Sequence, residues 1–150
     1  MRRIACVLSL LFALVGFSAP ALSAQSTGQD KPIRSQESRF KLEQNYPNPF
    51  NPTTRIPFEL SEELFVDGKT AVVSVRIYNV LQQFVASPTA LNHVGGEGVP
   101  VINLEYTQPG THEAYWDGLD LSGRRVASGI YFTQLTVNGK SVVRKMYVTK

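Results

Sequence analysis

Residues 42–60 have the sequence LEQNYPNPFNPTTRIPFEL, and this stretch decides the fold. Its first part contains three X-Pro pairs, Tyr46-Pro47, Asn48-Pro49 and Asn51-Pro52. Each proline fixes its own φ angle and pushes the residue before it toward extended geometry. In its second part, every second residue is apolar or β-branched: Thr54, Ile56, Phe58 and Leu60. This alternation is the period of a half-buried strand, so the stretch predicts a stiff, irregular corner that leads directly into a sheet.

The middle of the chain continues as strands and turns. Residues 70–80 alternate again, and four of them are expected to face the core: Ala71, Val73, Val75 and Ile77. Residues 83–86 follow a tight connection and are expected to form a short partner strand. Residues 87–109 contain several glycines and prolines, so they predict a long loop with one strand inside it, at 101–106.

The last forty residues contain the clearest turn patterns. Four short extended segments are predicted there: 111–116, 124–127, 130–137 and 140–148. The last two are joined by Asn138-Gly139, which between alternating runs is the strongest local pattern for a hairpin. Three residues of the closing segment are expected to point inward: Val142, Met146 and Val148. Arg144 interrupts this inward set and is expected to lie near a rim.

The strand pattern and the composition together predict the fold class. About seven short strands, frequent turns and no helical periodicity favour a two-sheet antiparallel β-sandwich. The chain has 150 residues, of which 43% are hydrophobic and 18% charged, so it has room for one ordinary globular domain.

The N-terminus has the order of a secretory signal peptide. Arg2 and Arg3 precede an apolar run at 4–17 and a small-residue stretch at 18–24, which predicts a signal peptide at 1–24. The run is too short for a permanent membrane span. Residues 25–39 then contain one large apolar residue and are expected to form a flexible linker, so the sandwich occupies 40–150.

Export with the signal peptide removed limits the possible chemistry. Without Arg2 and Arg3 the net charge falls by two, from +3 to +1, which is no footprint of a nucleic-acid-binding protein. Cys6 is the single cysteine and lies inside the signal peptide. Its removal excludes disulfides and thiolate chemistry in the exported chain.

Four stretches together carry a resemblance to a known family. They are NYPNPFNPTTRIPFEL at 45–60, VSVRIYNVLQQFV at 73–85, WDGLDLSGRRVASGIYFTQL at 116–135 and VVRKMYVTK at 142–150. In combination, they resemble the C-terminal sorting domain of type IX secretion cargo, in the version similar to the immunoglobulin-like domain of flagellar hook-capping proteins. The motif residues are Tyr46, Pro47, Asn48, Pro49, Phe50, Asn51, Pro52, Trp116, Asp117 and Gly118. The chain departs from the family in its longer stretch at 87–106 and in having only the 25–39 linker in place of a large passenger.

The resemblance implies an immunoglobulin-like sandwich that is exported in two steps. The signal peptide would take the chain across the inner membrane, and the outer-membrane translocon or a surface-attachment machinery would then recognise the folded domain. The protein would be secreted or lie at the cell surface after passing through the periplasm. By the same resemblance, the recognition surface lies at the C-terminal hairpin: Gly129, Ile130, Tyr131, Asn138, Gly139, Arg144, Lys145, Met146, Val148 and Lys150.

The charges of that hairpin allow two interpretations. Arg144, Lys145 and Lys150 form a basic edge that a partner could recognise by electrostatic complementarity. Equally, charged side chains on an edge strand protect it from aggregation. The sequence leaves these two interpretations open, and it leaves the oligomeric state open as well.

The sequence contains few residues of the kind that an enzyme active site requires. The chain has two histidines, His93 and His112, and no nucleophile elbow, metal-binding helix or paired-carboxylate motif. His112 and Glu113 are neighbours in a predicted strand and should point to opposite faces. We therefore expect a protein that is not an enzyme and that uses no cofactor.

An independent immunoglobulin-like adhesion, assembly or ligand-binding module is the alternative function. Asp117, Asp120 and Ser122 are candidate calcium ligands, although turn chemistry explains the same residues. A second candidate site is a sugar-stacking surface of four aromatic residues, Trp116, Tyr115, Tyr106 and Phe84. A tryptophan in a small sandwich more often lies in the core.

Overall fold

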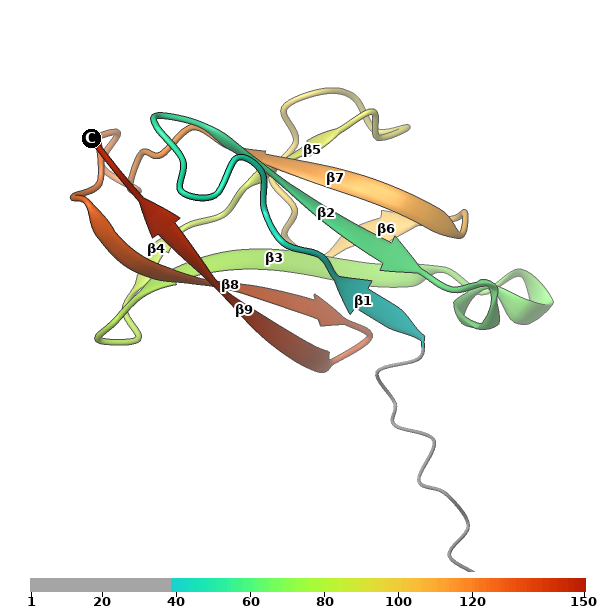
Figure 1. Cartoon of the computed structure of the whole chain (residues 1–150). Helices are drawn as coiled ribbons and strands as arrows, with labels where there is room; N and C mark the ends of the chain where they lie inside the picture. Colours follow the sequence, from blue (N-terminus) through green and yellow to red (C-terminus); the bar gives the residue numbers. More distant parts are fainter. Residues whose placement is uncertain (1–38) are drawn as a thin grey trace, which may run out of the picture. The chain divides into compact units, whose positions relative to one another are not determined.

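The computed structural model describes residues 39–150, in which two antiparallel sheets pack face to face (Figure 1). The predicted β-sandwich is therefore confirmed, with nine strands in the described residues rather than about seven. The signal peptide predicted at 1–24 and residues 25–38 of the predicted linker lie outside the described residues.

The first sheet contains four strands. Their order is β1 (Phe40–Leu42), β2 (Thr54–Leu60), β7 (Gly110–Trp116) and β5 (Thr89–Leu91). The strand predicted after the proline-rich corner is confirmed as β2, because its four alternate residues Thr54, Ile56, Phe58 and Leu60 are all buried. β2 pairs with β1 on one side and with β7 on the other.

The second sheet contains five strands. These are β4 (Phe84–Ala86), β3 (Ala71–Asn79), β8 (Gly129–Val137), β9 (Lys140–Val148) and β6 (Leu104–Tyr106). β8 pairs with one edge of β3, and the two short strands β4 and β6 share the other edge. The hairpin predicted at Asn138-Gly139 is confirmed, since both residues have the positive φ angles, 47° and 81°, that such a turn requires.

The core lies between the sheets. The four inward residues predicted on β3, Ala71, Val73, Val75 and Ile77, are each 0% exposed. On β9, Met146 and Val148 are buried and Val142 is half-buried, as predicted. The OH group of buried Thr133 donates a hydrogen bond to the Met146 sulfur at 3.3 Å, so this polar group of the core is satisfied.

Three local predictions differ from the structure. The loop at 87–109 contains two strands, because β5 pairs with β7 while Val101 lies buried outside any strand. The strand predicted at 101–106 therefore begins only at Leu104. Residues 124–127 form no strand, and Arg125 makes only an isolated bridge to Leu119.

Helical structure in residues 39–150 is limited to two short 3₁₀ turns, Glu62–Leu64 and Val66–Gly68. They connect β2 to β3, and Asp67 there has a φ angle of 60°. In this part of the chain no helix has the length and apolar character needed to cross a membrane.

Candidate functional site

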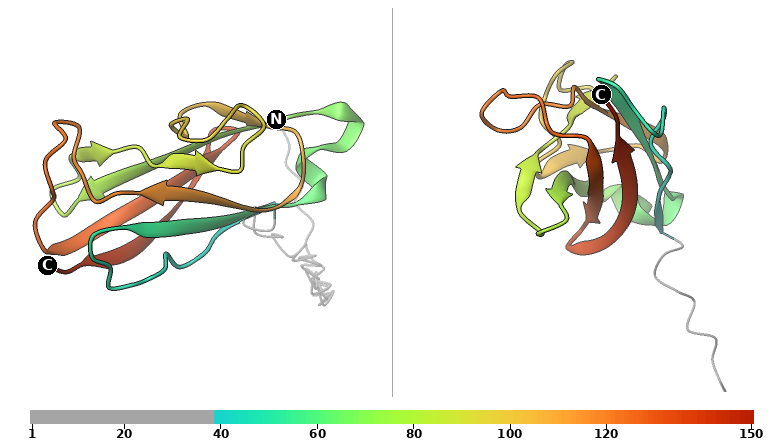
Figure 2. Two further views of the ribbon diagram at one scale, coloured as in Figure 1. Left: turned by 90° about the horizontal axis from the view of Figure 1, so that it is seen from above. Right: turned by 60° about the vertical axis from the view of Figure 1, so that its left-hand side comes forward.

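The proline-rich loop between β1 and β2 closes the edge of the last strand. The Phe50 N–H donates a hydrogen bond to the Tyr147 carbonyl at 3.0 Å, and the Thr149 N–H donates one to the Phe50 carbonyl at 3.0 Å. Asn48, which lies 99 positions before Tyr147, accepts the Tyr147 N–H on its Oδ1 at 2.9 Å. Both views of Figure 2 show the end of β9 next to this loop. The end of β9 is therefore paired with β8 on one side and with the proline-rich loop on the other.

The Trp116-Asp117-Gly118 turn packs against the same loop. The rings of Trp116 and Phe50 meet edge to face with their centroids 5.3 Å apart, and Tyr131 contacts Trp116 from β8 at 5.8 Å. A Cβ atom added to Gly118 would lie 2.4 Å from the Pro52 carbonyl oxygen, so only glycine fits this approach. Three stretches that are distant in sequence thus meet at one end of the sandwich. We call Phe50, Pro52, Trp116, Gly118 and Tyr147 the C-terminal corner.

A buried polar network fixes the loop from its other side. Asn45 is 4% exposed, and its Nδ2 donates to Thr54 Oγ1 at 2.9 Å and to the Pro47 carbonyl at 3.1 Å. Thr54 Oγ1 also donates to the Pro47 carbonyl, at 3.1 Å. Because buried polar groups must be satisfied, this network favours one loop conformation.

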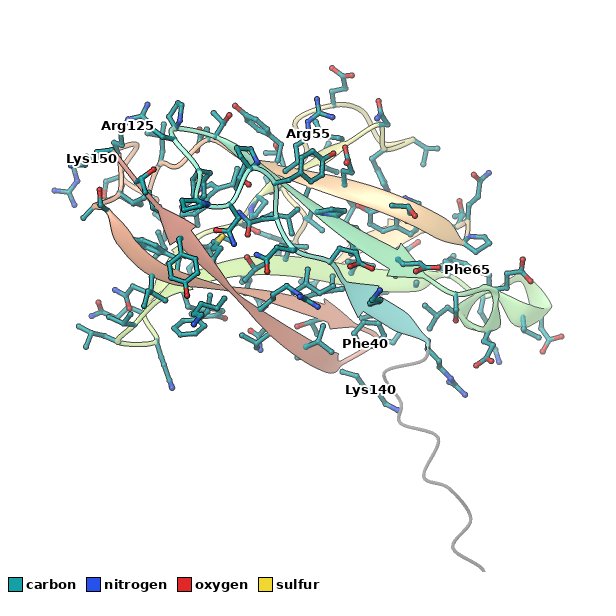
Figure 3. All side chains as sticks on the ribbon, in the orientation of Figure 1. Phe40, Arg55, Phe65, Arg125, Lys140 and Lys150 are labelled. Atoms are coloured by element: carbon teal, nitrogen blue, oxygen red, sulfur yellow. The ribbon has the colours of Figure 1, made fainter. Side chains whose placement is uncertain are left out.

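Tyr46 lies on the outer surface of the first sheet and takes part in a polar cluster there. Its hydroxyl donates a hydrogen bond to Glu113, and Arg55 Nη1 lies 3.2 Å from Glu113 Oε2 (Figure 3). The hydrogen bond to the Glu113 carboxylate raises the pKa of Tyr46, and the hydrogen bond with Tyr46 raises the pKa of Arg55. Solvent screening makes such exposed pairs small contributors to stability.

The residues predicted for recognition fall into two groups. Tyr131, Met146 and Val148 are buried, so a partner that contacts the folded domain does not reach them. The others are exposed: Gly129, Ile130, Asn138, Gly139, Arg144, Lys145 and Lys150. These do not form one patch, because the hairpin tip next to Lys140 lies at the Phe40 end of the sandwich and Lys150 lies at the Arg125 end (Figure 3).

Arg144 has a role in closing the seam between the two sheets. β1 and β9 are edge strands of different sheets, and a groove of about 530 Å³ lies between them, lined in part by Phe40 and Val142. Arg144 faces this groove, and its Nε donates a hydrogen bond to the Leu42 carbonyl at 2.9 Å. An inward charge on an edge strand blocks the pairing of further strands, so the contact favours the protective interpretation of this charge.

Two of the candidate calcium ligands, Asp117 and Asp120, accept hydrogen bonds from backbone N–H groups of their own turn. Asp117 Oδ1 accepts the Leu119 N–H at 3.0 Å, and Asp120 Oδ1 accepts the N–H groups of Ser122 and Arg124 at 2.8 and 3.0 Å. The Arg124 N–H is the main cause that lowers the pKa of Asp120. Within residues 39–150, no group of three or more histidine, cysteine, aspartate or glutamate residues is placed to bind a metal ion.

The two histidines flank Tyr106. Their ring centroids lie 4.8 Å (His93) and 4.6 Å (His112) from that of Tyr106, and His112 Nε2 lies 3.1 Å from the Gln108 carbonyl oxygen. Glu113 points to the opposite face and pairs with Arg55, so His112 and Glu113 do not act together. Burial lowers the pKa of His112 because it disfavours the charged ring.

This pKa shift predicts a pH dependence of stability. The unfolded chain binds a proton at His112 near pH 6.5, whereas the folded chain binds it only at a lower pH, so the unfolded state holds more protons in that window. The free energy of unfolding is expected to fall as the pH drops below 6.5, and His112→Gln should reduce this dependence. Urea unfolding of both proteins at a series of pH values measures it. Equal pH slopes for the two proteins would contradict the shift.

Tyr106 provides a second prediction in the same cluster. Its ring is 4% exposed, and its hydroxyl has no hydrogen-bond partner among residues 39–150. Burial raises the pKa of Tyr106 to about 12. Removing an unsatisfied buried group is neutral or stabilising, so Tyr106→Phe should change the free energy of unfolding by less than about 1 kcal/mol or increase it. A loss of more than about 2 kcal/mol in urea unfolding would show that the hydroxyl has a partner.

The candidate sugar-stacking surface is not formed, and the core position expected for the tryptophan is confirmed. Trp116 and Tyr106 belong to the core, and the Trp116 Nε1–H donates to the Leu119 carbonyl at 2.9 Å. Of the four candidate residues, Phe84 is exposed, and it lies on the outer face of the second sheet. Tyr78 and Phe132, which the sequence analysis did not single out, are paired there across β3 and β8. Their pattern was present in the sequence as the outward half of each alternating strand.

Comparisons with known proteins give weak likenesses. No protein-family profile matches the chain, and no curated protein matches it. Among solved structures the chain is similar to PorZ, described as an essential surface component of the type IX secretion system of Porphyromonas gingivalis. The identity is 21% over 73% of this chain and 11% of PorZ, with a TM-score of 0.42. It is also similar to the alkylpurine DNA glycosylase AlkC of Pseudomonas fluorescens, solved on DNA with an abasic site analogue. There the identity is 13% over 75% of this chain and 31% of AlkC, with a TM-score of 0.44. At these values neither likeness assigns an activity or a partner to the chain.

Proposed function

We propose that this chain is an exported, non-catalytic β-sandwich that acts as a C-terminal sorting or surface-attachment domain of the type IX secretion system. Its partner is the outer-membrane translocon or the attachment machinery. The domain itself performs no chemistry and needs no cofactor.

The C-terminal corner is the observation that carries this proposal. The motif stretches through which the sequence resembles the sorting domains are separate in the chain, yet Phe50, Trp116 and Gly118 meet around the end of β9. We infer that recognition of the folded domain requires its C-terminal strand to be held in one defined conformation. The pairing of Tyr147 and Thr149 with Phe50 provides such a conformation.

The exposed side chains near this strand are the ones that a partner could contact. Ile130 and Tyr147 lie opposite each other on β8 and β9, and each is 38% exposed. Lys145 Nζ lies 5.2 Å from the centroid of the Tyr147 ring, which is the range of a cation–π contact. These residues form a mixed aromatic and basic surface beside the end of the chain.

A reporter inserted into the full chain tests the proposal. A fluorescent protein placed after Ala24 keeps the signal peptide in front and residues 25–150 behind. This fusion protein is expressed in a host with a type IX system and in a matched translocon-null strain, with a version that lacks residues 25–150 as the control. We expect reporter on the surface or in the medium of the first strain only, and only with residues 25–150 present.

Two outcomes would reject the sorting function. One is a reporter that stays in the periplasm of the competent host while protease resistance shows the domain to be folded. The other is equal release from the translocon-null strain. Either outcome would leave the adhesion, assembly or ligand-binding module as the better account.

A further inference from the structure

The outer face of the second sheet exposes a continuous set of apolar side chains. It is formed by residues that alternate with the core residues of β3, β8 and β9 and by the neighbouring Phe84 of β4. Its apolar members are Tyr78, Phe84, Ile130, Phe132, Val143 and Tyr147. We call this set the outer-sheet face. Val143, on the edge strand β9, is 59% exposed.

The outer-sheet face is hollowed rather than flat. A groove of about 600 Å³ crosses it, lined by Tyr78, Val80, Gln82, Phe132, Gln134 and Val143. Val80 and Gln82 of the β3–β4 turn line one side of the groove, and Val80 is 61% exposed. Val143 of β9 lines the other side. Such a concave apolar surface marks a binding site more often than scattered single residues do.

The charged residues beside the groove have one sign, whereas Glu105 of β6 lies on the same face next to Val72 and does not line the groove. The outward positions of β3, β8 and β9 include Arg76 and Lys145 but no aspartate or glutamate. Arg76 lies opposite Gln134, which lies opposite Val143, and Lys145 lies opposite Phe132. No carboxylate in residues 39–150 forms an ion pair with either cation. Each cation is thus the cross-strand neighbour of a residue that lines the groove, Gln134 for Arg76 and Phe132 for Lys145.

The two cations beside the groove favour an acidic polypeptide over a second copy of this chain as the partner. A second copy of the same face would bring two further cations into the interface and no carboxylate from the outward positions of β3, β8 and β9, and like charges in an interface oppose association. A polypeptide with carboxylates beside apolar side chains would pair both cations and fill the groove. Aromatic residues and arginine are the types that protein interfaces favour.

We propose that the outer-sheet face is a docking surface for an acidic, apolar polypeptide segment, centred on Phe132 with Arg76 and Lys145 as its charge contacts. Ile130, Tyr147 and Lys145 also belong to the surface proposed for the sorting partner. The docking proposal nevertheless stands apart from the sorting function, because it concerns peptide binding that is measured without any transport component.

Peptide titration of the ¹⁵N-labelled full chain tests the proposal by NMR. The probe is a soluble peptide of about twelve residues that mixes leucine and glutamate. One analogue replaces glutamate with lysine, and another replaces leucine with serine. We expect saturable shifts at the amides of the outward residues of β3, β8 and β9 with the first peptide and not with the two analogues.

Matched variants identify the contacts. Arg76→Glu and Val143→Glu should each weaken binding of the leucine–glutamate peptide about tenfold, through charge and through loss of apolar contact respectively. Val94→Glu makes the same change at a loop residue that is 85% exposed and should leave binding unchanged. Each variant is first shown to be folded by its amide spectrum.

Three results would overturn the proposal. The first is equal binding of the lysine analogue, and the second is absence of shifts on this face at millimolar peptide. The third is self-association of the chain that Val143→Glu abolishes, because this would assign the face to a second copy.

Discussion

Replacement of Gly118 by alanine is expected to lower the free energy of unfolding by about 2 to 5 kcal/mol. The φ angle of Gly118 is +74°, which costs an alanine about 1 to 2 kcal/mol. The added Cβ would also lie 2.4 Å from the Pro52 carbonyl oxygen, so the proline-rich loop must move. Forced overpacking of this kind costs about 1 to 3 kcal/mol more. Urea unfolding of the two proteins measures the difference.

Gly123 offers a matched control in the same turn region. Its φ angle is +73°, but no atom lies within 4 Å of the Cβ that alanine would add. Gly123→Ala should therefore lower the free energy of unfolding only by the cost of the positive φ angle, about 1 to 2 kcal/mol. If both alanine variants lost the same stability, Gly118 would not make its close approach to Pro52.

Phe50→Ala is expected to have an effect of similar size, about 3 to 5 kcal/mol, because it removes a large side chain from the core. Phe50 is 1% exposed and packs on Trp116. Trp116 is the single tryptophan of the chain, so its fluorescence emission should shift when the ring beside it is lost. Denaturant unfolding followed by this emission measures both effects.

Phe84→Ala is the control for the Phe50 substitution. Phe84 is 41% exposed on the outer face of the second sheet, and its removal should cost about 1 kcal/mol or less. An equal loss in both variants, or an unchanged tryptophan emission in Phe50→Ala, would contradict the contact between Phe50 and Trp116.

The long strands were predictable because local pattern and burial agree in them. In β3, Val75 and Ile77 alternate with the more polar residues Ser74, Arg76 and Tyr78, and both valine and isoleucine contribute to the core. Asn138-Gly139 has the two residue types that tolerate the positive φ angles of its turn. In such segments the local alternation of side chains agrees with their burial in the fold, so the strand can be predicted from the sequence.

The short strand predicted at 83–86 is confirmed as β4. The short strands β1 and β5 were not predictable, because each depends on pairing with a separate segment of the chain. Thr89–Leu91 follows Pro88 in a glycine-rich region and becomes strand β5 only by pairing with β7. Phe40–Leu42 is likewise a strand only through its pairing with β2. Three residues carry too little periodicity for a pattern to be recognised.

The candidate site was predictable in its residues but not in its geometry. The sequence stretches identified Phe50, Trp116 and Gly118 by resemblance, yet no local rule brings them together. Their contact depends on the approach of the loop to β9 and on the space that Gly118 leaves for Pro52. The core position expected for Trp116 is confirmed, whereas the contacts of its ring with Phe50 and Tyr131 depend on the packing of both sheets.

Amide hydrogen exchange at Thr149 tests most directly whether the C-terminal corner holds the last strand in place. The Thr149 N–H donates to the Phe50 carbonyl, so this amide should be protected although it is the penultimate residue of the chain. We expect Gly118→Ala to abolish the protection of Thr149 and Gly123→Ala to preserve it. Exchange of Thr149 in the unsubstituted chain at the rate of an unstructured terminus would contradict the account.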